Sequence, residues 1–473
     1  MQVEFKKMIT LYCARWVLPI TSVAIEDGAV AVEGHRIAAV GARAALKEKY
    51  PEAAVEDFGE AVIMPGFVNA HSHLELTAMR GYLEQEESAF TAWLGKLTFA
   101  RHNYMTAEDL YISAVWGAAE AARAGVTTLA DASDAASASM RALNDVGLRG
   151  IVYQESFGPD PRLALENFEK LREKIGVLRT FETGLVRAGV SPHAVYTVSA
   201  PLIEMLTGFA LDENLPLMMH AAESEAEELL VREGLGAFAL NLARRGIEWR
   251  APGISVIEYL EKIGLLGARP LLAHCIRASE ADIERIVDAG AGIAHCPKSN
   301  AKLGHGRAPF AAFVNKGARV GLGSDSVAGN NVCDMLEEAR FAALGSRAGG
   351  DKLSSGEMMS AHEALYAATV GGARAVGLDN QTGALMEGLQ ADLVVINLKA
   401  TYQRPVYEPL SALVFSSSAR DVLLTVVAGR EIFRMGRVLT VDEERLSARM
   451  MEIQEKLREA SAAWSKMQSF PKE

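Results

Sequence analysis

The chain reads Val62-Ile-Met-Pro-Gly-Phe-Val-Asn-Ala-His71-Ser-His73-Leu-Glu-Leu-Thr77 near its N-terminal end. An apolar run ends in Pro65-Gly66, a second apolar pair follows, and His71 and His73 then stand two positions apart. Residues i and i+2 of a β-strand face the same side. We therefore expect both imidazoles to point to one face at a strand end, where a metal ion can take two nitrogens. A His-x-His pair alone is a weak signal, because half-buried strands also carry histidines for packing.

Four later apolar runs also end in a polar residue with metal-binding or acid–base chemistry. They are Leu215-Pro-Leu-Met-Met-His220 with Glu223 three residues on, Pro270-Leu-Leu-Ala-His274, Gly292-Ile-Ala-His295-Cys-Pro-Lys-Ser-Asn300, and Val320-Gly-Leu-Gly-Ser-Asp325. These short strand patterns alternate with helical patterns. In a (β/α)8 barrel, ligands and catalytic groups lie at the carboxyl ends of the strands. The sequence therefore predicts an α/β fold with such a barrel and a site at that end.

The order of these motifs resembles the metal-dependent amidohydrolase superfamily, and within it the branch of amino-heterocycle deaminases and chlorohydrolases. The resemblance runs from about Val23 to about Leu439. It implies a (β/α)8 TIM-like barrel beside a small β-sandwich that both chain ends build, and strand patterns at both ends agree with this. We predict the sandwich from residues 1–64 and 383–442, the barrel from 65–382, and a C-terminal helix from 443–473.

The resemblance also implies the metal ligands, which are His71, His73, His220 and Asp325. Three neutral imidazoles and one carboxylate suit a borderline divalent ion, Zn2+ first and Fe2+ second. Two-metal members of the superfamily bridge their metals with a carbamylated lysine on the fourth strand. The corresponding stretch here, residues 185–199, contains no lysine. We therefore expect one divalent metal ion.

Three residues are predicted to be catalytic. Glu223, one turn beyond His220, would exchange protons between a metal-activated water and the substrate; His274 would polarise the attacked centre; Asp325 would both ligate and accept a proton. A plainer interpretation exists for each motif, because a strand-end histidine can serve packing and Glu223 can belong to a solvated acidic helix start. Five matched positions in the family's order favour the site. His295 and Asn300 are expected to shape its pocket.

The predicted reaction is hydrolytic displacement at an electron-poor ring carbon, with loss of ammonia or halide. The segments around Glu75 and around Asn300 resemble aminodeoxyfutalosine deaminases. We therefore predict deamination of a 6-aminopurine nucleoside with a modified 5′ group, with aminodeoxyfutalosine as the favoured substrate. His193, Glu75 and Trp93 are predicted to bind this substrate. For His193 and Glu75, and also for His102, a purely structural role stays open, and the role of His305 is not assigned.

Several alternatives stay open beside this prediction. S-adenosylhomocysteine/methylthioadenosine deaminases usually carry a ribose-binding glutamate after a Trp-Leu segment. Counting on from Trp93-Leu94 reaches Arg101-His102 instead, which counts against that specificity without excluding it or adenosine. A chlorotriazine-type hydrolase and a guanine or pterin deaminase are the enzyme rivals. The non-enzyme rival is an inactive amidohydrolase-like scaffold, although such proteins typically lose the metal ligands that this chain retains.

The overall composition limits the classes of partner that the chain is expected to bind. The 473 residues include 48 Lys and Arg against 60 Asp and Glu, for a formal net charge of −12, which argues against nucleic acid and anionic membranes. Four cysteines without CxxC spacing indicate neither a disulfide framework nor a cysteine zinc site. Arg15 and Pro19 interrupt the apolar N-terminal stretch, so we expect no signal peptide or membrane span. We predict a cytoplasmic homo-oligomer, a dimer, acting on a small heterocyclic substrate.

Overall fold

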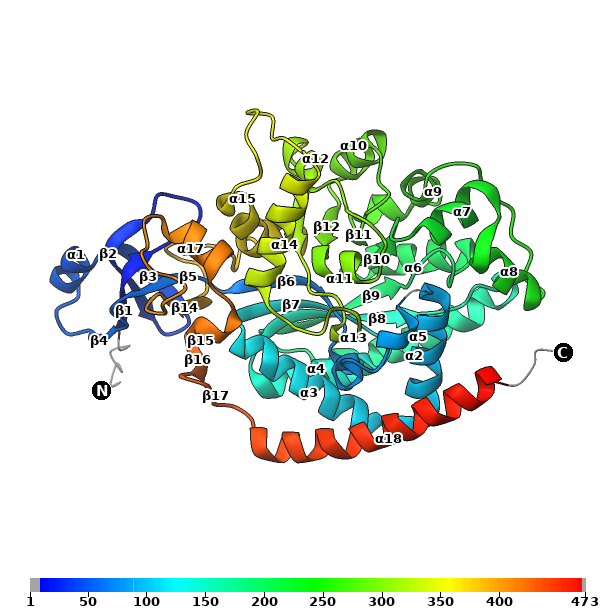
Figure 1. Ribbon diagram of the computed structural model, residues 1–473, viewed down its shortest axis with the longest axis horizontal. Helices are drawn as coiled ribbons and strands as arrows, with labels where there is room; N and C mark the ends of the chain where they lie inside the picture. The colour runs from blue at the N-terminus through cyan, green and yellow to red at the C-terminus, as the bar shows by residue number, and fades with distance from the viewer. Residues whose placement is uncertain (1–8, 88, 470–473) are drawn as a thin grey trace.

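The computed structural model describes residues 9–87 and 89–469 of the chain. Figure 1 shows a sheet built from both chain ends beside a larger body of alternating strands and helices. The first sheet has nine strands: β1 (Ile9–Val17), β2 (Ile25–Glu33), β3 (Arg36–Ala42), β4 (Ala54–Asp57), β5 (Ala61–Pro65), β14 (Leu393–Asn397), β15 (Val422–Val427), β16 (Arg430–Arg434) and β17 (Arg437–Val438).

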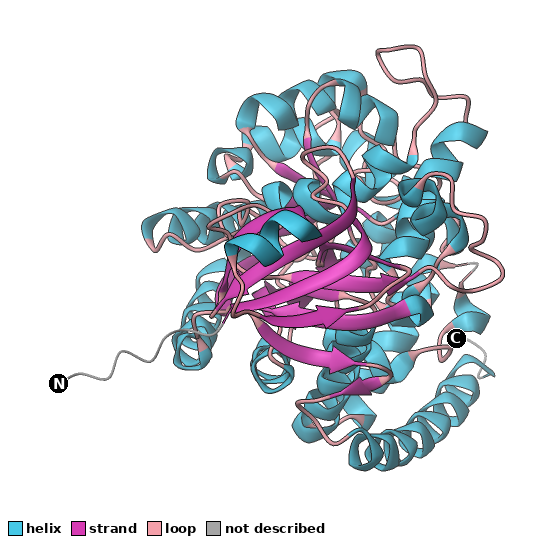
Figure 2. Ribbon diagram, turned by 90° about the vertical axis from the view of Figure 1, so that its left-hand side faces the viewer, coloured by secondary structure: helices cyan, strands magenta, loops and turns pink. Residues whose placement is uncertain are grey.

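The two ends of the chain meet in this sheet through one antiparallel pair. β5 pairs with β14 from Ala61↔Asn397 to Pro65↔Leu393, directly before the chain enters the barrel. β2 and β3 form the expected hairpin, whose turn uses Gly34 at φ 58°, a conformation that glycine adopts without steric cost. Figure 2 shows the strands as one continuous twisted layer. The expected β-sandwich strands are thus hydrogen-bonded as a single sheet.

Eight parallel strands form the larger body: β6 (Phe67–Ser72), β7 (Val126–Ser133), β8 (Arg149–Ser156), β9 (Val186–Pro192), β10 (Met218–Ala221), β11 (Leu271–His274), β12 (Gly292–His295) and β13 (Arg319–Leu322). They pair in chain order as two four-stranded sheets. Parallel bridges Val190↔Leu217 and Ser72↔Asp325 join the two sheets at both edges, so the strands form a ring. The predicted barrel order is confirmed.

The strands point one set of small and branched side chains inward. The buried interior cluster includes Val68, Ile151, Tyr153, Met218 and Leu271, which come from four different strands. Gly189 leaves the space that Tyr153 occupies, because a Cβ at Gly189 would lie 2.6 Å from a ring carbon of Tyr153. The interior is therefore a packed core, as in other barrels of eight strands.

Helices cover the outside of the barrel and carry the predicted caps. Thr106 caps α3 by a capping box with Asp109, which satisfies backbone N–H groups of the first turn. The helices are α1 (Arg43–Lys49), α2 (Phe90–Tyr104), α3 (Ala107–Arg123), α4 (Ala136–Val146), α5 (Ala164–Leu178), α6 (Ala200–Asp212), α7 (Glu225–Glu233), α8 (Gly236–Arg244), α9 (Val256–Lys262), α10 (Glu280–Ala289), α11 (Pro297–Lys302), α12 (Phe310–Asn315), α13 (Val327–Asn330), α14 (Met335–Ala348), α15 (Ala361–Tyr366), α16 (Gly372–Ala375), α17 (Pro409–Ser416) and α18 (Glu443–Ser469).

The last helix, α18, runs along the outside of α3 and α2 (Figure 1). Lys456 donates to the carboxylate of Asp109 in α3 at 2.6 Å, and the ring of Trp464 lies 5.5 Å from that of Phe99 in α2. α18 begins at Glu443, the residue from which a C-terminal helix was predicted, and residues 470–473 of that prediction lie outside the described residues. Within the described part of the chain, every helix is too short or too polar to cross a membrane.

Candidate active site

Four predicted ligands converge at the carboxyl ends of β6, β10 and β13. The Nε2 atoms of His73 and His220 lie 3.3 Å apart. Asp325 Oδ1 lies 3.4 Å from His71 Nε2 and 3.5 Å from His73 Nε2. Donor atoms of His71, His73 and His220 all lie within 4.8 Å of one another. Residues far apart in the sequence therefore present three imidazoles and one carboxylate to a common point.

The hydrogen bonds around these residues leave their inner nitrogens free for a cation. His220 Nδ1 donates to the backbone carbonyl of His193 at 3.0 Å, so its Nε2 carries a lone pair toward His73. Both ring nitrogens of His71 are buried and lack a hydrogen-bond partner among the described residues. Buried polar atoms almost always find partners. A divalent ion would satisfy these lone pairs, so the donor set fits a metal.

Burial keeps these side chains in the protonation states that metal binding needs. Burial lowers the pKa of His71 to about 4 and holds the pKa of His220 well below its ordinary value. Burial opposes ionisation of Asp325, but the imidazole of His71 and the other nearby imidazoles hold the pKa of its carboxyl well below the usual range. Neutral imidazoles and an ionised carboxylate are the forms that bind Zn2+ and similar ions.

The backbone is strained at the carboxyl ends of the strands that carry the predicted ligands and His274. Ala222, His274, Cys275 and Asp325 have φ values of 52°, 72°, 49° and 57°, in the left-handed region that side chains other than glycine rarely adopt. Gly323 allows the close approach of β6, because a Cβ there would lie 2.8 Å from the Cβ of His71. The surrounding packing thus holds the ligand-bearing ends in one arrangement.

Glu223 faces two histidines at the edge of the ligand cluster. Its Oε1 lies 3.7 Å from His274 Nε2 and 3.7 Å from His305 Nε2. His274 Nδ1 donates to Asn300 Oδ1 at 2.9 Å, so in the neutral ring the lone pair lies on Nε2, which is directed to Glu223. Glu227 Oε2 accepts from the backbone N–H of Glu223 at 2.7 Å and fixes the loop. The acid and the imidazole therefore lie within reach of one shared water or substrate atom.

The carboxylate of Glu75 makes its hydrogen bonds within the protein. Its Oε2 accepts hydrogen bonds from Ser133 Oγ at 2.6 Å and from the Ala135 N–H at 2.7 Å, and its Oε1 lies 3.2 Å from an Arg101 guanidinium nitrogen. The side chain is buried in the short helix η1 (Leu74–Met79). This arrangement does not support the prediction that Glu75 binds substrate, because both oxygens are occupied by the β7–α4 junction.

The other predicted or unassigned residues divide between the site and its surroundings. His193 packs its ring 4.7 Å from that of His220, whereas Trp93 is buried in α2 and reaches the site through Phe90, whose ring packs 4.5 Å from that of His305. His295 stacks on Phe310 behind the site. His102 is exposed on α2 and lies apart from the cluster.

Three residues that the sequence analysis left without a role also reach the site. Ser299 donates to Asp325 Oδ2 at 2.5 Å, and His305 faces Glu223 as described above. Glu155, at the end of β8, has a carboxylate oxygen within 4.8 Å of a nitrogen of His193 and of His220. Burial raises the pKa of Glu155 well above its ordinary value. The signal for Glu155 was present, because it too ends an apolar strand.

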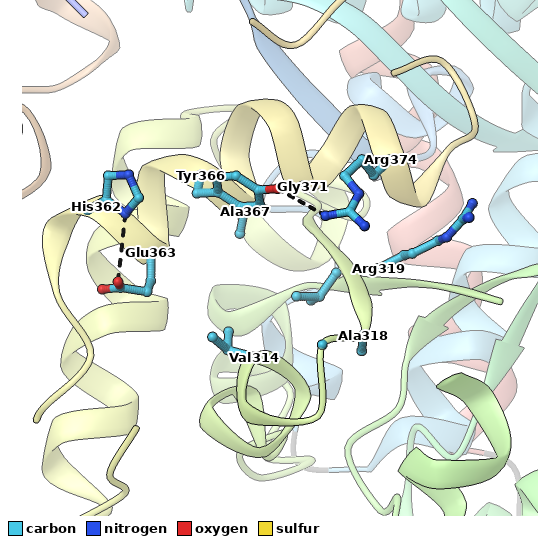
Figure 3. Close-up of a pocket in the computed structure, with 11 residues that line it drawn as sticks. Val314, Ala318, Arg319, His362, Glu363, Tyr366, Ala367, Gly371 and Arg374 are labelled. Carbon is cyan, nitrogen blue, oxygen red and sulfur yellow. Dashed lines mark hydrogen bonds and ion pairs between the residues drawn. The ribbon is translucent and has the colours of Figure 1, made fainter. Parts of the chain in front are cut away.

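A cavity of about 230 Å³ lies elsewhere, at the opposite end of β13 (Figure 3). It is lined by residues of α12, β13, α15 and α16, among them Arg319, His362 and Tyr366. Arg374 donates to the Tyr366 hydroxyl at 3.1 Å on its rim. Because Arg319 begins β13 and the ligand Asp325 follows its end, this cavity is separate from the histidine cluster.

Comparison with known proteins identifies the family of the chain. A family model described as "Amidohydrolase family" matches residues 62–432, and an imidazolonepropionase-like composite domain of bacteria matches residues 28–53. A 5-methylthioadenosine/S-adenosylhomocysteine deaminase of Syntrophus aciditrophicus is 31% identical over 444 residues, which cover 93% of this chain and 95% of that protein.

Solved structures show the same fold. An adenosine deaminase from Xanthomonas campestris with bound zinc superposes with a TM-score of 0.82 at 27% identity, over 95% of this chain and 98% of that one. The aminofutalosine deaminase of Helicobacter pylori, in complex with methylthio-coformycin, gives a TM-score of 0.74 at 21% identity, over 90% of this chain and 100% of that one. From the ligand geometry and the match over most of its length, this chain belongs to the amidohydrolase family.

Proposed function

We propose that the chain is a metal-dependent hydrolytic deaminase of adenine nucleosides that carry a modified 5′ group. The observation that carries this proposal is the arrangement of an acid, Glu223, and an imidazole, His274, beside three histidines and an aspartate that fit a divalent ion. The relative from Syntrophus aciditrophicus, a 5-methylthioadenosine/S-adenosylhomocysteine deaminase, supports the substrate class. Those two nucleosides are therefore the first to test.

Aminodeoxyfutalosine stays a prediction for the same site. It rests on the segments around Glu75 and Asn300, while the structural likeness to an aminofutalosine deaminase, at 21% identity, supports the fold alone. All these nucleosides share the 6-aminopurine ring, so the chemistry below does not depend on which 5′ group is present. The dimeric state and the cytoplasmic location also stay predictions.

His71, His73, His220 and Asp325 would hold the metal, for which Zn2+ is the first choice and Fe2+ the second. When bound, a divalent ion lowers the pKa of a coordinated water from 15.7 toward about 7. His193 fixes His220 through its carbonyl, and Ser299 fixes Asp325 through its hydroxyl. These contacts orient the ligating atoms without taking part in the reaction themselves.

The proton transfers fall to Glu223. Water adds to the ring carbon that bears the amino group, and the proton it loses passes to Glu223 and from there to the purine. The C–N bond then breaks, ammonia leaves, and the carbon keeps the oxygen as a carbonyl. His274, whose Nε2 is free to accept a hydrogen bond, holds the attacking water, and Asp325 takes the proton of the added hydroxyl and passes it to the amino group, which leaves as ammonia.

The test is ammonia release from 5′-methylthioadenosine, S-adenosylhomocysteine, aminodeoxyfutalosine and adenosine, with metal content determined on the same sample. The expected result is one equivalent of ammonia per nucleoside consumed and about one metal ion per chain. An assay that stays flat with all four nucleosides on metal-loaded protein would refute the proposal. Chloride release from a chlorotriazine, or ammonia from guanine or a pterin, would then identify the rival reaction.

A further inference from the structure

The cavity at the amino end of β13 combines an apolar lining with two arginines. Figure 3 shows Arg319 and Arg374 on one side of it, and His362 with Glu363 on the other. The apolar part of the lining comes from the end of α12, the start of β13 and the segment after α15, and includes Val314, Ala318, Val320 and Ala367. Its volume of about 230 Å³ is below the roughly 300–1,000 Å³ of sites for drug-sized ligands, so only a small molecule fits.

Neither arginine of the cavity has a carboxylate partner in the described part of the chain. Arg374 donates to the Tyr366 hydroxyl at 3.1 Å, and the guanidinium of Arg319 makes no hydrogen bond or ion pair with residues 9–87 or 89–469. Lys316, next to the cavity, is by contrast paired with Glu284 at 2.7 Å. This side of the cavity therefore offers two positive charges, each on a planar fork of donors that fits the oxygens of an anion.

The hydroxyl of Tyr366 adds a further donor. Its oxygen accepts from Arg374, so its own proton remains to be donated to another acceptor. Tyr366 is the last residue of α15 and is partly buried. A ligand with two neighbouring oxygens can therefore accept from the guanidinium of Arg374 and from the hydroxyl of Tyr366 together.

The opposite side of the cavity limits the charge of such a ligand. Glu363 Oε2 accepts from the Ser360 N–H at 3.0 Å, and Glu363 Oε1 lies 3.7 Å from His362 Nδ1. The interaction raises the pKa of His362 and, first among several causes, lowers that of Glu363 to about 2. Glu363 thus stays ionised, and it repels a second negative charge on a ligand. The lining favours a monoanion over a dianion.

The wall that carries Tyr366 and Arg374 is fixed against the barrel. α15 continues through the π-turn η6 (Ala367–Gly371) into α16, and π-turns are rare and frequently stand at functional sites. A Cβ at Gly371 would lie 2.5 Å from the carbonyl oxygen of Val320, so the backbone of η6 contacts β13 directly. These contacts hold the wall in place, and its donors need little reordering to bind a ligand.

We propose that this cavity binds a small organic carboxylate. The carboxylate accepts from Arg319, Arg374 and the Tyr366 hydroxyl, and the apolar body of the ligand lies on Val314 and Ala318. The inference goes beyond the proposed function, because the cavity and the predicted ligands stand at opposite ends of the barrel strands. A phosphate monoester shares the anionic chemistry, and the test below distinguishes the two.

The test is a titration of 4-fluorobenzoate into the metal-loaded full chain, followed by ¹⁹F NMR. Saturable binding is expected for wild type. Arg319→Gln and Arg374→Gln should each weaken it about 3–10-fold, since both guanidinium groups are partly exposed. Ala318→Phe fills the cavity and keeps both arginines, so it should abolish saturable binding. Arg458→Gln is the matched control, because that arginine is 63% exposed on α18, and it should bind as wild type.

Two further probes test the chemistry of the ligand. 4-Fluorobenzamide has a similar shape without the charge and should not bind. 4-Fluorophenyl phosphate should bind more weakly than the benzoate, because its second charge meets Glu363. Tighter binding of the phosphate than of the benzoate, or equal binding of the amide, would overturn the assignment of a carboxylate.

The residue dependence decides whether the cavity is the site. Absence of saturable binding in wild type would overturn the inference. So would benzoate binding that persists unchanged in both Ala318→Phe and the double variant Arg319→Gln/Arg374→Gln, since the probe then binds elsewhere, for example at the metal. If Ala318→Phe does not fold, the double variant at the two exposed positions decides. Ammonia release does not enter this test, so the proposed function can fail while the cavity binds its ligand, and the reverse.

Discussion

The Nε2 atoms of His73 and His220 face each other at 3.3 Å, although 146 residues separate them in the chain. Because His220 donates its Nδ1 proton to a backbone carbonyl, its Nε2 lone pair points at the other imidazole. Two such nitrogens at this distance are stable only with a proton or a cation between them. The metal is therefore expected to contribute to the stability of the fold as well as to its chemistry.

Removal of the metal should abolish ammonia release and lower the melting temperature. A ligand present at a hundred times its Kd stabilises the native state by about 2.7 kcal/mol. Dialysis against a chelator, followed by thermal unfolding and an activity assay, measures both effects, and added Zn2+ should restore them. Equal melting temperatures with and without metal would contradict the assignment. His102→Ala, on an exposed position of α2, should behave as wild type throughout.

Glu223→Gln should lower kcat by about 10²–10⁴-fold, the usual contribution of a positioned acid–base group. Glutamine keeps the shape of the side chain but cannot carry the proton. Metal content, measured by elemental analysis, should not change. Glu225→Gln is the matched control, because that side chain is 77% exposed and faces Arg277 on the surface. Loss of metal in Glu223→Gln would show that the residue acts as a ligand instead.

Asn300→Ala should lower kcat by about 10–100-fold while KM changes little. The amide oxygen of Asn300 holds the Nδ1 proton of His274, and without it the imidazole can rotate or exchange tautomers. Asn300→Asp, which keeps an acceptor at the same place, should retain more activity than Asn300→Ala. The steady-state parameters of both variants decide this, and the reverse order would contradict the positioning role.

Gly323→Ala should weaken metal affinity about 10–100-fold, as other changes behind a metal ligand do. The added Cβ would lie 2.8 Å from the Cβ of His71, and both belong to backbone that cannot move independently. Competition with a coloured chelator measures the affinity. Gly208→Ala in α6 is the control, because a Cβ there has open space. Unchanged affinity in Gly323→Ala would mean that β6 and β13 can separate.

Asp109→Asn should lower the free energy of unfolding by about 1 kcal/mol at pH 7. Burial raises the pKa of Asp109, but hydrogen bonds from Lys456 and Thr106 outweigh it and hold that pKa below the ordinary value. A depressed pKa gives stability that is present above the unfolded-state pKa of about 3.9 and is lost as the pH falls through the folded-state value. Urea unfolding of metal-free protein at pH 7, 5 and 3 should therefore show the difference shrink only at the lowest pH.

Much of the fold could be predicted because the predicted site residues stand at the ends of strand patterns in the sequence. His220, His274 and Asp325 each end or follow a short apolar run, and the carboxyl ends of parallel strands meet at one end of a barrel. The strand order from β6 to β13, and the pairing of the two chain ends, followed from the family resemblance and agree with the structure.

The contacts of several site residues could not be predicted from the sequence, because they depend on the direction that the side chain takes after a strand ends. Glu75 stands two residues from His73, yet the η1 turn directs its carboxylate to the β7–α4 junction. His305 reaches Glu223 from a glycine-flanked turn whose path depends on packing against Phe90. Glu155 was readable from the alternation of β8, but whether its carboxylate has a partner is a property of the neighbouring strands.

The docking of α18 on α2 has a consequence for engineering this chain. Trp464 contacts Gly95 and Phe99 of the helix that also carries Trp93 and Arg101, so the far carboxyl end of the chain fixes one wall near the site. Affinity tags or truncations in α18 are therefore expected to affect the activity of the protein. Libraries that aim to change its substrate range should therefore include α18 positions, because these positions help to place α2.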